Sequence, residues 1–343
     1  MPSFALRLIR WQQRHGRHDL PWQHTRDPYH VWLSEIMLQQ TQVVTVIAYY
    51  ERFLRRFPTL GALAGAHVDE VMALWSGLGY YARARNLHAC ARVVVEQHGG
   101  QFPRDPDAIA RLPGIGRSTA NALAAFCFDA RVPILDGNVK RVLCRHQGIE
   151  GFPGNAAVEQ QLWQCATRLL PQRDTASYIQ AQMDLGATLC TRSRPTCDLC
   201  PVADDCIAYR EQRTAELPTP RPRRIIPEKT VTLLVLRQGT RILLEIRPPN
   251  GIWGGLHSLP ELPEGENAAG YCLKQLGLEI SAVLPASTFM HRFTHFRLQI
   301  HPLLCTIATP LRRAPAGHVW CETGHLPEAA LPAPVRKILS AIP

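Results

Sequence analysis

The sequence lacks the features that direct a protein into a membrane or out of the cell. Its N-terminal stretch MPSFALRLIRWQQRHG holds scattered arginines and no apolar core followed by a small-residue cleavage site, so a secretory signal is not expected. No apolar run is long enough to cross a membrane. We therefore expect a cytoplasmic protein without a membrane partner, in a compartment that keeps thiols reduced.

Histidine is missing from the neighbourhood of a compact cysteine cluster. Cys190, Cys197, Cys200 and Cys206 are separated by six, two and five residues, which indicates a shared metal centre. Zinc sites usually pair two short Cys-x-x-Cys knuckles or add histidines, whereas four thiolates in one loop are typical of an iron–sulfur cluster. The spacing favours iron–sulfur and leaves zinc open. A disulfide-stapled loop would need an oxidising compartment, of which there is no sign.

Acidic residues are outnumbered in this chain. Its 38 lysines and arginines against 28 aspartates and glutamates give a net charge of +10. A basic chain favours a nucleic-acid partner, but many basic proteins bind no polynucleotide, so the charge alone does not decide. The 343 residues, 46% of them hydrophobic, suffice for two domains of ordinary size.

Alternating strand patterns are missing from the first part of the chain. Up to residue 212, apolar residues recur at helical spacing, for example over 32–50 and 158–170. Residues 213–229 are rich in proline and arginine, which suits an extended linker. A second, α+β domain is predicted over 230–343, with helices at 267–276 and at the C-terminus and with strands at 230–237, 241–247, 296–307 and 319–322.

Two glycines stand directly before a predicted helix over 117–128. Gly114 and Gly116 lie in the segment LPGIGRSTA, where a missing side chain lets backbone amides approach a ligand closely. The N-terminus of the helix that follows favours an anion. This pattern is typical of a helix-hairpin-helix that holds a DNA phosphate without reading the base sequence. An ordinary glycine-containing turn between helices is the alternative.

An aspartate ends the extended apolar segment that follows this helix. Asp136 lies in VPILDGNVKRVL, where it begins another predicted helix. It suits an N-cap, a position that aspartate fills well. It also suits a carboxylate placed beside a sugar whose phosphate the hairpin holds. The residues themselves leave both roles open.

Taken in order, the hairpin LPGIG, the acid of VPILDGNVKRV and the C-x6-C-x2-C-x5-C loop resemble the iron–sulfur members of the helix-hairpin-helix DNA glycosylase superfamily. The resemblance implies an all-α, two-lobed domain over 1–212, with DNA in its cleft and a nucleotide flipped into it. It makes Asp136 the catalytic aspartate and the loop 190–206 the holder of one 4Fe–4S cluster, ligated by the four cysteines. It also implies DNA contacts at the following positions: Gly114, Gly116, Ser118 and Asn138.

One residue distinguishes two branches of this superfamily. The endonuclease III branch excises oxidised pyrimidines and carries a lysine nucleophile two positions beyond the second glycine, where this chain has Ser118. Without an amine there is no Schiff base at that site, so a strand-cleaving lyase step is not expected. Lys140 is interpreted as a phosphate contact. The resemblance therefore predicts a monofunctional enzyme.

The string WLSEIMLQQTQ over 32–42 resembles the MutY-type adenine-excising branch. Its Glu35 lies in an apolar helix, where a carboxyl group has a raised pKa and can stay protonated near neutrality. Protonation of adenine N7 by Glu35 would make the base a leaving group, while Asp136 stabilises the positive charge developing on the sugar. On its own, Glu35 would be interpreted as a solvated helix residue.

Further positions match residues of this branch that contact the lesion. Gln40 and Tyr80 correspond to side chains that enter the DNA stack around the lesion pair, and Gln180 to one near the adenine pocket. A core aromatic is the alternative for Tyr80. Arg83 and Arg85 are expected to contact phosphates.

The C-terminal segment GIWGGLHSLPE, followed by a helix, looks like a Nudix fold without its metal site, because the positions that would bind magnesium carry Gly270, Tyr271, Lys274 and Gln275. Such a degenerate domain resembles the one with which MutY-type enzymes recognise 8-oxoguanine. The loop that makes this contact would be Phe293, Thr294 and His295, with threonine in place of the usual serine, which keeps the hydroxyl group.

The resemblance thus implies a monofunctional DNA N-glycosylase of base excision repair. Its partner would be double-stranded DNA in which adenine is mispaired with 8-oxoguanine or guanine, and the protein would be a nucleoid-associated monomer. The close alternative is an endonuclease III-like glycosylase and lyase. A non-catalytic DNA-binding module with a structural metal would leave Glu35 and Asp136 without a role, and a Nudix hydrolase lacks its metal carboxylates.

Overall fold

The computed structural model describes residues 3–222, 226–248, 251–326 and 329–341. The chain forms two compact units, the first comprising Met1–Ala64 and Ala89–Arg223 and the second Gly65–His88 and Arg224–Pro343. The predicted linker 213–229 includes residues 223–225, which lie outside the described residues, and the domain limits at 212 and 230 stay predictions. None of the described helices is both long and apolar enough to pass through a bilayer.

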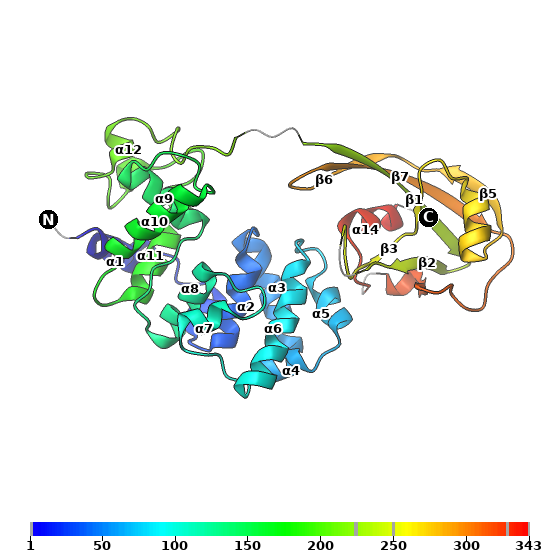
Figure 1. Ribbon diagram of the computed structural model, residues 1–343, viewed down its shortest axis with the longest axis horizontal. Helices are drawn as coiled ribbons and strands as arrows, with labels where there is room; N and C mark the ends of the chain where they lie inside the picture. Colours follow the sequence, from blue (N-terminus) through cyan, green and yellow to red (C-terminus); the bar gives the residue numbers. More distant parts are fainter. Residues whose placement is uncertain (1–2, 223–225, 249–250, 327–328, 342–343) are drawn as a thin grey trace. The chain divides into compact units, whose positions relative to one another are not determined.

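The described residues of the first unit are helical and contain no β-strand, as predicted (Figure 1). Its α-helices are α1 (Phe4–His15), α2 (Pro28–Leu38), α3 (Val43–Arg56), α4 (Leu60–Ala64), α7 (Pro106–Ala110), α8 (Arg117–Phe128), α9 (Gly137–Gln147), α10 (Ala156–Arg168), α11 (Thr175–Thr188) and α12 (Ile207–Arg210). Short 3-10 turns lie at Pro21–His24 and Cys197–Leu199, and α6 (Ala82–His98) begins in the second unit and continues in the first.

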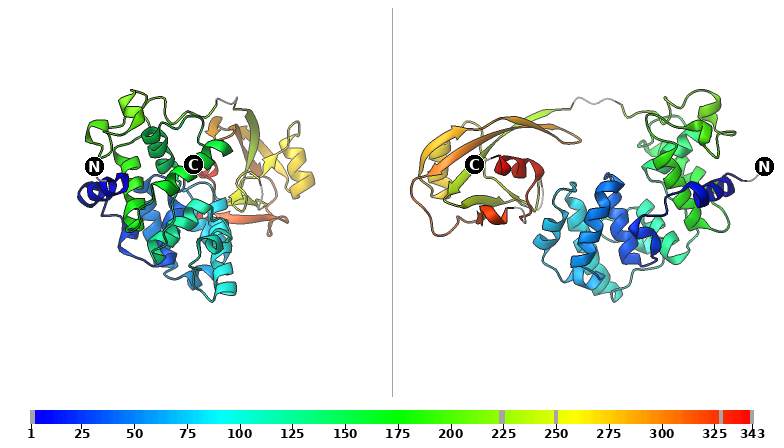
Figure 2. Two further views of the ribbon diagram at one scale, coloured as in Figure 1. Left: turned by 60° about the vertical axis from the view of Figure 1, so that its left-hand side comes forward. Right: turned by 180° about the vertical axis from the view of Figure 1, so that it is seen from behind.

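Two apolar cores hold the helices of the first unit together. Leu143 of α9, Leu162 of α10 and Ile179 of α11 are fully buried in one of them. In the other, Leu8 of α1 packs with Leu185 of α11. Figure 2 shows α1, in dark blue, beside the green helices of the first unit. Because α9 and α11 take part in these packed layers, the residues at their N-terminal ends and on their facing sides are held in place.

The second unit contains a mixed sheet with helices. Its strands are β1 (Glu228–Gln238), β2 (Arg241–Ile246), β3 (His257–Ser258), β4 (Glu261–Leu262), β5 (Ile280–Pro285), β6 (Phe289–Arg292), β7 (Arg297–Ile307) and β8 (His318–Glu322). The main path of the sheet is β3-β2-β1-β7-β5, and β1 and β7 are parallel whereas the other pairs are antiparallel. The helices are α5 (Val68–Trp75), α13 (Ala268–Tyr271), a π-helical turn at Cys272–Leu276 and α14 (Ala333–Ser340).

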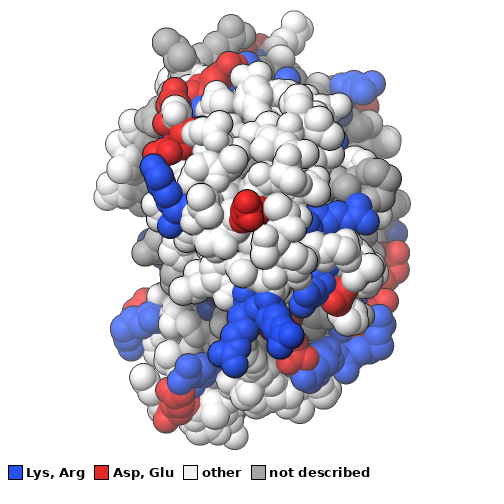
Figure 3. All heavy atoms as spheres, turned by 90° about the vertical axis from the view of Figure 1, so that its right-hand side faces the viewer, with Lys and Arg blue, Asp and Glu red and all other residues white. Residues whose placement is uncertain are grey.

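This sheet confirms the α+β prediction for the C-terminal part of the chain. The predicted strands correspond to β1, β2, β7 and β8, while β3, β4, β5 and β6 were not predicted. Leu234 and Leu236 of β1 and Leu243 of β2 are fully buried against the helical turn around Cys272. On the face drawn in Figure 3, lysine and arginine side chains gather in the lower half, which agrees with the net charge of +10.

Candidate active site

A cavity of about 970 Å³ lies within the first unit. Its lining comes from α2, α8, α9 and α11 and from the segment between α1 and α2. Predicted site residues from distant parts of the sequence meet there, namely Glu35, Gln40, Ser118, Asp136, Asn138 and Gln180. The structure therefore brings both predicted catalytic carboxyl groups to one cavity.

Glu35 projects into this cavity from a helix that is mostly buried. The helix α2 is capped by Asp27, whose carboxylate accepts a hydrogen bond of 2.8 Å from Tyr29 N. Ser34 and Ile36, on either side of Glu35, are 1% and 4% exposed. Burial and, to a smaller extent, the negative charge of Asp136 together raise the pKa of Glu35 to about 7. A carboxyl group with this pKa is protonated to a large extent at neutral pH.

Asp136 both caps α9 and lines the cavity, so the two roles left open by the sequence are compatible. Its carboxylate accepts a hydrogen bond of 2.7 Å from Val139 N and one of 3.4 Å from Asn138 Nδ2. Burial raises the pKa of Asp136, and the hydrogen bonds together with the charge of Arg141 offset part of this rise. The cap fixes the carboxylate at the edge of the cavity.

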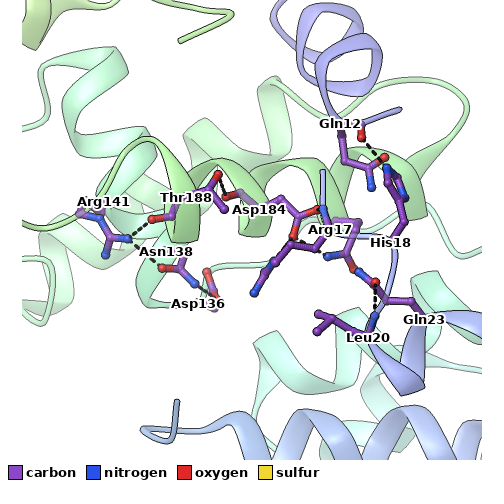
Figure 4. A network of polar contacts seen from close by, with 12 residues as sticks. Gln12, Arg17, His18, Leu20, Gln23, Asp136, Asn138, Arg141, Asp184 and Thr188 are labelled. Carbon is purple, nitrogen blue, oxygen red and sulfur yellow. Dashed lines mark hydrogen bonds and ion pairs between the residues drawn. The ribbon is translucent and has the colours of Figure 1, made fainter. Parts of the chain in front are cut away.

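A close crossing of α9 and α11 sets the position of Asn138. A Cβ atom on Gly186 would lie 2.6 Å from Asn138 Cβ, so only glycine permits this approach. Arg141 Nη2 donates to Gly186 O at 2.6 Å and to Asn138 Oδ1 at 2.8 Å, and its Nε donates to Cys190 O at 2.7 Å. Figure 4 shows Asn138 between Arg141 and Asp136, so these contacts join the start of the cysteine loop to the cavity.

A buried ion pair on the other side of the cavity was not predicted. Asp184 is fully buried and accepts a hydrogen bond from Arg17 Nε at 2.8 Å (Figure 4). It also accepts one from Gln180 Nε2 at 3.0 Å. Arg17 and Gln180 both line the cavity. The spacing of Gln180 and Asp184, four residues apart on one helix, was the signal that could have indicated their contact.

The hairpin forms at the predicted place. Gly114 has a φ of +74°, which favours glycine, and Gly116 is the N-cap of α8. Ser118 Oγ accepts a hydrogen bond of 3.0 Å from Leu135 N and so supports the segment that leads into Asp136. Lys140, predicted to contact phosphate, forms an ion pair of 2.8 Å with Glu159. Its ammonium group therefore has a partner within the protein.

Gln40 and Tyr80 share an unusual backbone conformation. Their φ angles are +56° and +49°, in the left-handed region that side-chain-bearing residues seldom adopt. Both side chains are exposed, and the 44% exposure of Tyr80 argues against a core aromatic. The expectation for Arg83 is not supported, because its guanidinium is buried and donates to Leu78 O and Gly79 O at 3.3 Å and 3.1 Å.

The four clustered cysteines line one small cavity between α9, α11 and α12. Burial, with smaller contributions from the neighbouring cysteines, raises the pKa of Cys200 to about 12. Arg145, 2% exposed, places Nη1 3.4 Å from Cys190 Sγ. No group of three or more His, Cys, Asp or Glu side chains in the described part of the chain is arranged to hold a single metal ion. Four thiols that line one cavity do fit a larger centre with four thiolate ligands.

Residues 293–295 form the turn between β6 and β7. Phe293 stacks on Phe296 with a ring separation of 4.3 Å, and its N–H donates to Phe296 O at 2.9 Å. Thr294 and His295 are exposed at the tip. The stacked rings of Phe293 and Phe296 therefore support a turn whose hydroxyl group and imidazole face the solvent.

Comparisons with known proteins agree on the two parts of the chain. A family model described as HhH-GPD superfamily base excision DNA repair protein matches residues 33–168, and a NUDIX domain model matches residues 231–341. The adenine DNA glycosylase of Buchnera aphidicola subsp. Acyrthosiphon pisum is 35% identical over 338 residues, which cover 98% of this chain and 96% of that protein. The chain belongs to the adenine DNA glycosylase family. This confirms the predicted family and the predicted order of its two folds.

Membership of the adenine DNA glycosylase family extends to distant organisms. The human adenine DNA glycosylase is 35% identical over 400 residues, covering 98% of this chain and 73% of that protein. Among solved structures, that of a thermostable thymine-DNA glycosylase is similar with a TM-score of 0.54 and 28% identity, over 61% of this chain and 95% of that chain. The fold shared with that glycosylase thus extends over 61% of this adenine DNA glycosylase family member.

Proposed function

We propose that this protein is a monofunctional glycosylase that removes adenine mispaired with 8-oxoguanine, and with guanine, from double-stranded DNA in base excision repair. The observation that carries the proposal is the meeting of Glu35 and Asp136 at one cavity, with the pKa of Glu35 raised to about 7. Membership of the adenine DNA glycosylase family supports the same activity.

Glu35 is proposed as the acid that protonates adenine N7. A general acid is most effective when its pKa lies near the working pH, since it is then both protonated and able to release its proton. Burial of Glu35, with a smaller contribution from the negative charge of Asp136, provides that pKa. Protonation withdraws electrons from the bond between base and sugar and makes adenine a better leaving group.

Asp136 is proposed to stabilise the positive charge that develops on the sugar as this bond breaks. Its carboxylate is fixed by Val139 N–H and by Asn138, so it need not reorient during the reaction. Burial favours its neutral form, and a positive charge on the sugar beside it favours the ionised form. The carboxylate therefore stabilises the transition state more than the ground state.

The absence of an amine at the cavity supports hydrolysis without strand cleavage. No lysine occurs among the described residues that line the cavity. Ser118, at the position of the lysine nucleophile in the endonuclease III branch, uses its hydroxyl to hold Leu135 N. The described lining residues therefore offer no amine on which a Schiff base with the sugar could form, which disfavours the endonuclease III-like alternative.

The remaining predicted residues are proposed to bind DNA around the mispair. Gln40 and Tyr80 would enter the base stack, Gly114, Gly116, Ser118 and Asn138 would lie along the backbone, and Gln180 would contact adenine. Phe293, Thr294 and His295 would read 8-oxoguanine, and their position on an exposed turn supports this. We further propose a monomer associated with the nucleoid.

Cys190, Cys197, Cys200 and Cys206 are proposed to hold one 4Fe–4S cluster. Their four thiols line the same cavity, and the chemistry of four thiolates suits this centre. When bound, the cluster would cross-link the loop 190–206 through its iron–thiolate bonds. Arg145 supports the loop from the protein side, because its guanidinium donates to Thr191 O at 2.7 Å and to Arg192 O at 3.0 Å.

A single-turnover assay on a duplex with one 8-oxoguanine:adenine pair tests the proposal. Wild-type protein and Glu35→Gln are compared, and each sample is divided between alkali treatment and none. We expect strand breaks only after alkali, and their loss in Glu35→Gln. Breaks without alkali that survive in the variant would show a lyase nucleophile and overturn the role given to Ser118.

A further inference from the structure

The turn between α5 and α6 presents Tyr80 in a conformation that has to be maintained by other contacts. Gly77, Gly79 and Tyr80 have φ angles of +101°, +74° and +49°. The left-handed region suits the two glycines, whereas a tyrosine adopts it only where the surrounding structure holds it there. The side chain of Tyr80 is nevertheless 44% exposed and so receives limited support from its own packing.

Two side chains hold this turn from within. Trp75 Nε1 donates to Gly79 O at 3.2 Å, and Arg83 Nη2 donates to the same carbonyl oxygen at 3.1 Å. The guanidinium of Arg83 also lies over the rings of Trp75 and Tyr80, at 5.2 Å and 5.6 Å from their centres. These contacts fix the shape of the turn but not its place on the rest of the second unit.

The first residue of the turn is bonded to the C-terminal part of the same unit. Ser76 Oγ donates to Leu331 O at 2.9 Å and accepts from Arg336 Nη2 at 3.1 Å. Arg336, on α14, also donates to Ala329 O at 3.0 Å. Leu331 is 1% exposed, so the hydroxyl of Ser76 reaches a buried segment. One arginine thus joins the start of the turn to the segment that leads into α14.

A second contact lies just beyond the turn. Arg85, in the first turn of α6, donates through Nη1 to Gly254 O. Trp253, the residue before Gly254, is 6% exposed and has a φ of +57°. Its ring centre lies 6.3 Å from that of Phe293. Contacts therefore run from Arg85 through the segment 253–254 to the loop 293–295. Arg85 was predicted to contact phosphate, and the structure adds this bond within the protein.

We infer that Arg85 and Arg336 are positioning residues that fix the turn 76–81 on the C-terminal domain, so that Tyr80 and the loop 293–295 act on the DNA as one assembly. This inference rests on the proposed function, which gives Tyr80 a place in the base stack and gives the loop the reading of 8-oxoguanine. The consequence is that recognition of 8-oxoguanine and insertion of Tyr80 are coupled. Recognition of the base opposite adenine then favours insertion of Tyr80 and extrusion of adenine, because both depend on one set of contacts.

Arg336→Gln tests the coupling, with Arg241→Gln as its matched control. Arg241 lies in the same domain, where it makes a surface ion pair of 4.0 Å with Glu322. Single-turnover excision rates are measured on 8-oxoguanine:adenine and guanine:adenine duplexes, and extrusion is followed by the fluorescence of 2-aminopurine in place of adenine. We expect Arg336→Gln to reduce the ratio of the two rates by about threefold or more, and Arg241→Gln to leave it unchanged.

A double-mutant cycle with Tyr80→Leu separates positioning from a general loss of structure. If Arg336 acts through Tyr80, then Arg336→Gln has little further effect on the fluorescence change in a Tyr80→Leu background. Ser76→Ala removes the bond between Ser76 and Arg336 and the bond from Ser76 to Leu331 O, with a smaller change in volume. It should act in the same direction, which covers the case in which Arg336→Gln fails to fold.

The outcomes distinguish this inference from the proposed function. If Tyr80→Leu lowers the rate ratio while Arg336→Gln and Ser76→Ala do not, the positioning role is wrong and the proposed function stands. Fully additive effects in the cycle would also contradict it. If Tyr80→Leu changes neither the ratio nor the fluorescence, the proposed role of Tyr80 fails, and the inference fails with it.

Discussion

The carboxyl group of Glu35 determines how the excision rate should depend on pH. Only the protonated form can donate to adenine N7, and the pKa of Glu35 is raised to about 7. We therefore expect the single-turnover rate to be highest below this pH and to fall by about tenfold for each pH unit well above it. The measurement is the rate on an 8-oxoguanine:adenine duplex across this range.

Glu35→Gln is the control for this profile, because glutamine has a similar shape and no titrating proton. Its residual rate should not vary with pH around neutrality. A wild-type rate that stays constant from acid to alkaline pH would assign the proton to another donor, and the same profile in both proteins would show that Glu35 does not titrate in the reaction.

Single residues were predictable from the sequence where a local string defines their surroundings. Glu35 lies within an apolar helical string, so its burial and raised pKa followed from its neighbours. The bond between Arg17 and Asp184 joins residues 167 positions apart, and nothing local to either residue indicates the other. Arg145 was missed for the same reason, since it bonds to the carbonyl of Leu217.

At the scale of helices, the crossing of α9 and α11 depends on Gly186. Alanine there would place a Cβ 2.6 Å from Asn138 Cβ and 3.1 Å from its Cα, which the backbone of α9 cannot avoid without moving. We expect Gly186→Ala to destabilise the protein by about 2 kcal/mol and to slow excision, because Asn138 would shift relative to Asp136. Thermal unfolding and the single-turnover rate measure the two effects.

Gly61→Ala is a matched control, since Gly61 also lies in a helix of the first unit. The nearest atom to a Cβ at Gly61 is Thr59 Oγ1 at 3.9 Å, an ordinary contact. Helix propensity then makes alanine stabilising by up to about 1 kcal/mol. Equal unfolding temperatures for the two variants would mean that α9 and α11 separate without cost, contrary to the packing described.

Helices and strands differ in how well their limits could be predicted. The helix α8 has the predicted bounds, because a glycine N-cap precedes it and a regular apolar pattern fills it. The strands β5 and β6 were missed. Most of β5 is exposed, so its apolar residues do not alternate with polar ones in the way that indicates a half-buried strand.

At the scale of the whole molecule, the division of the chain into units was only partly predictable. The sequence indicates a change from helical to β-rich pattern after residue 212. It does not indicate that Gly65–His88 groups with the C-terminal residues, because that grouping depends on bonds such as Ser76 to Leu331, which are 255 positions apart. Composition and periodicity describe segments, whereas such contacts depend on how the segments pack.

The net charge of +10 makes DNA affinity dependent on salt, and the loop 190–206 is expected to contribute. Arg192 and Arg194 have exposed side chains, while their backbone is held by Arg145 Nη2 donating to Arg192 O and by Thr191 Oγ1 donating to Arg194 O at 2.6 Å. A fixed backbone with exposed guanidinium groups suits phosphate binding. Arg194→Gln should weaken binding and reduce the slope of log affinity against log salt by about 1.

The control for this prediction is Arg92→Gln, which removes the same charge from an exposed helix position where Arg92 already pairs with Glu96 at 3.1 Å. Both variants lower the net charge equally, so a general effect of charge would reduce the salt slope in both. A contact made by Arg194 itself would change the slope in Arg194→Gln alone. If the affinity and slope of Arg194→Gln match those of the wild type, the loop does not meet phosphate through this residue.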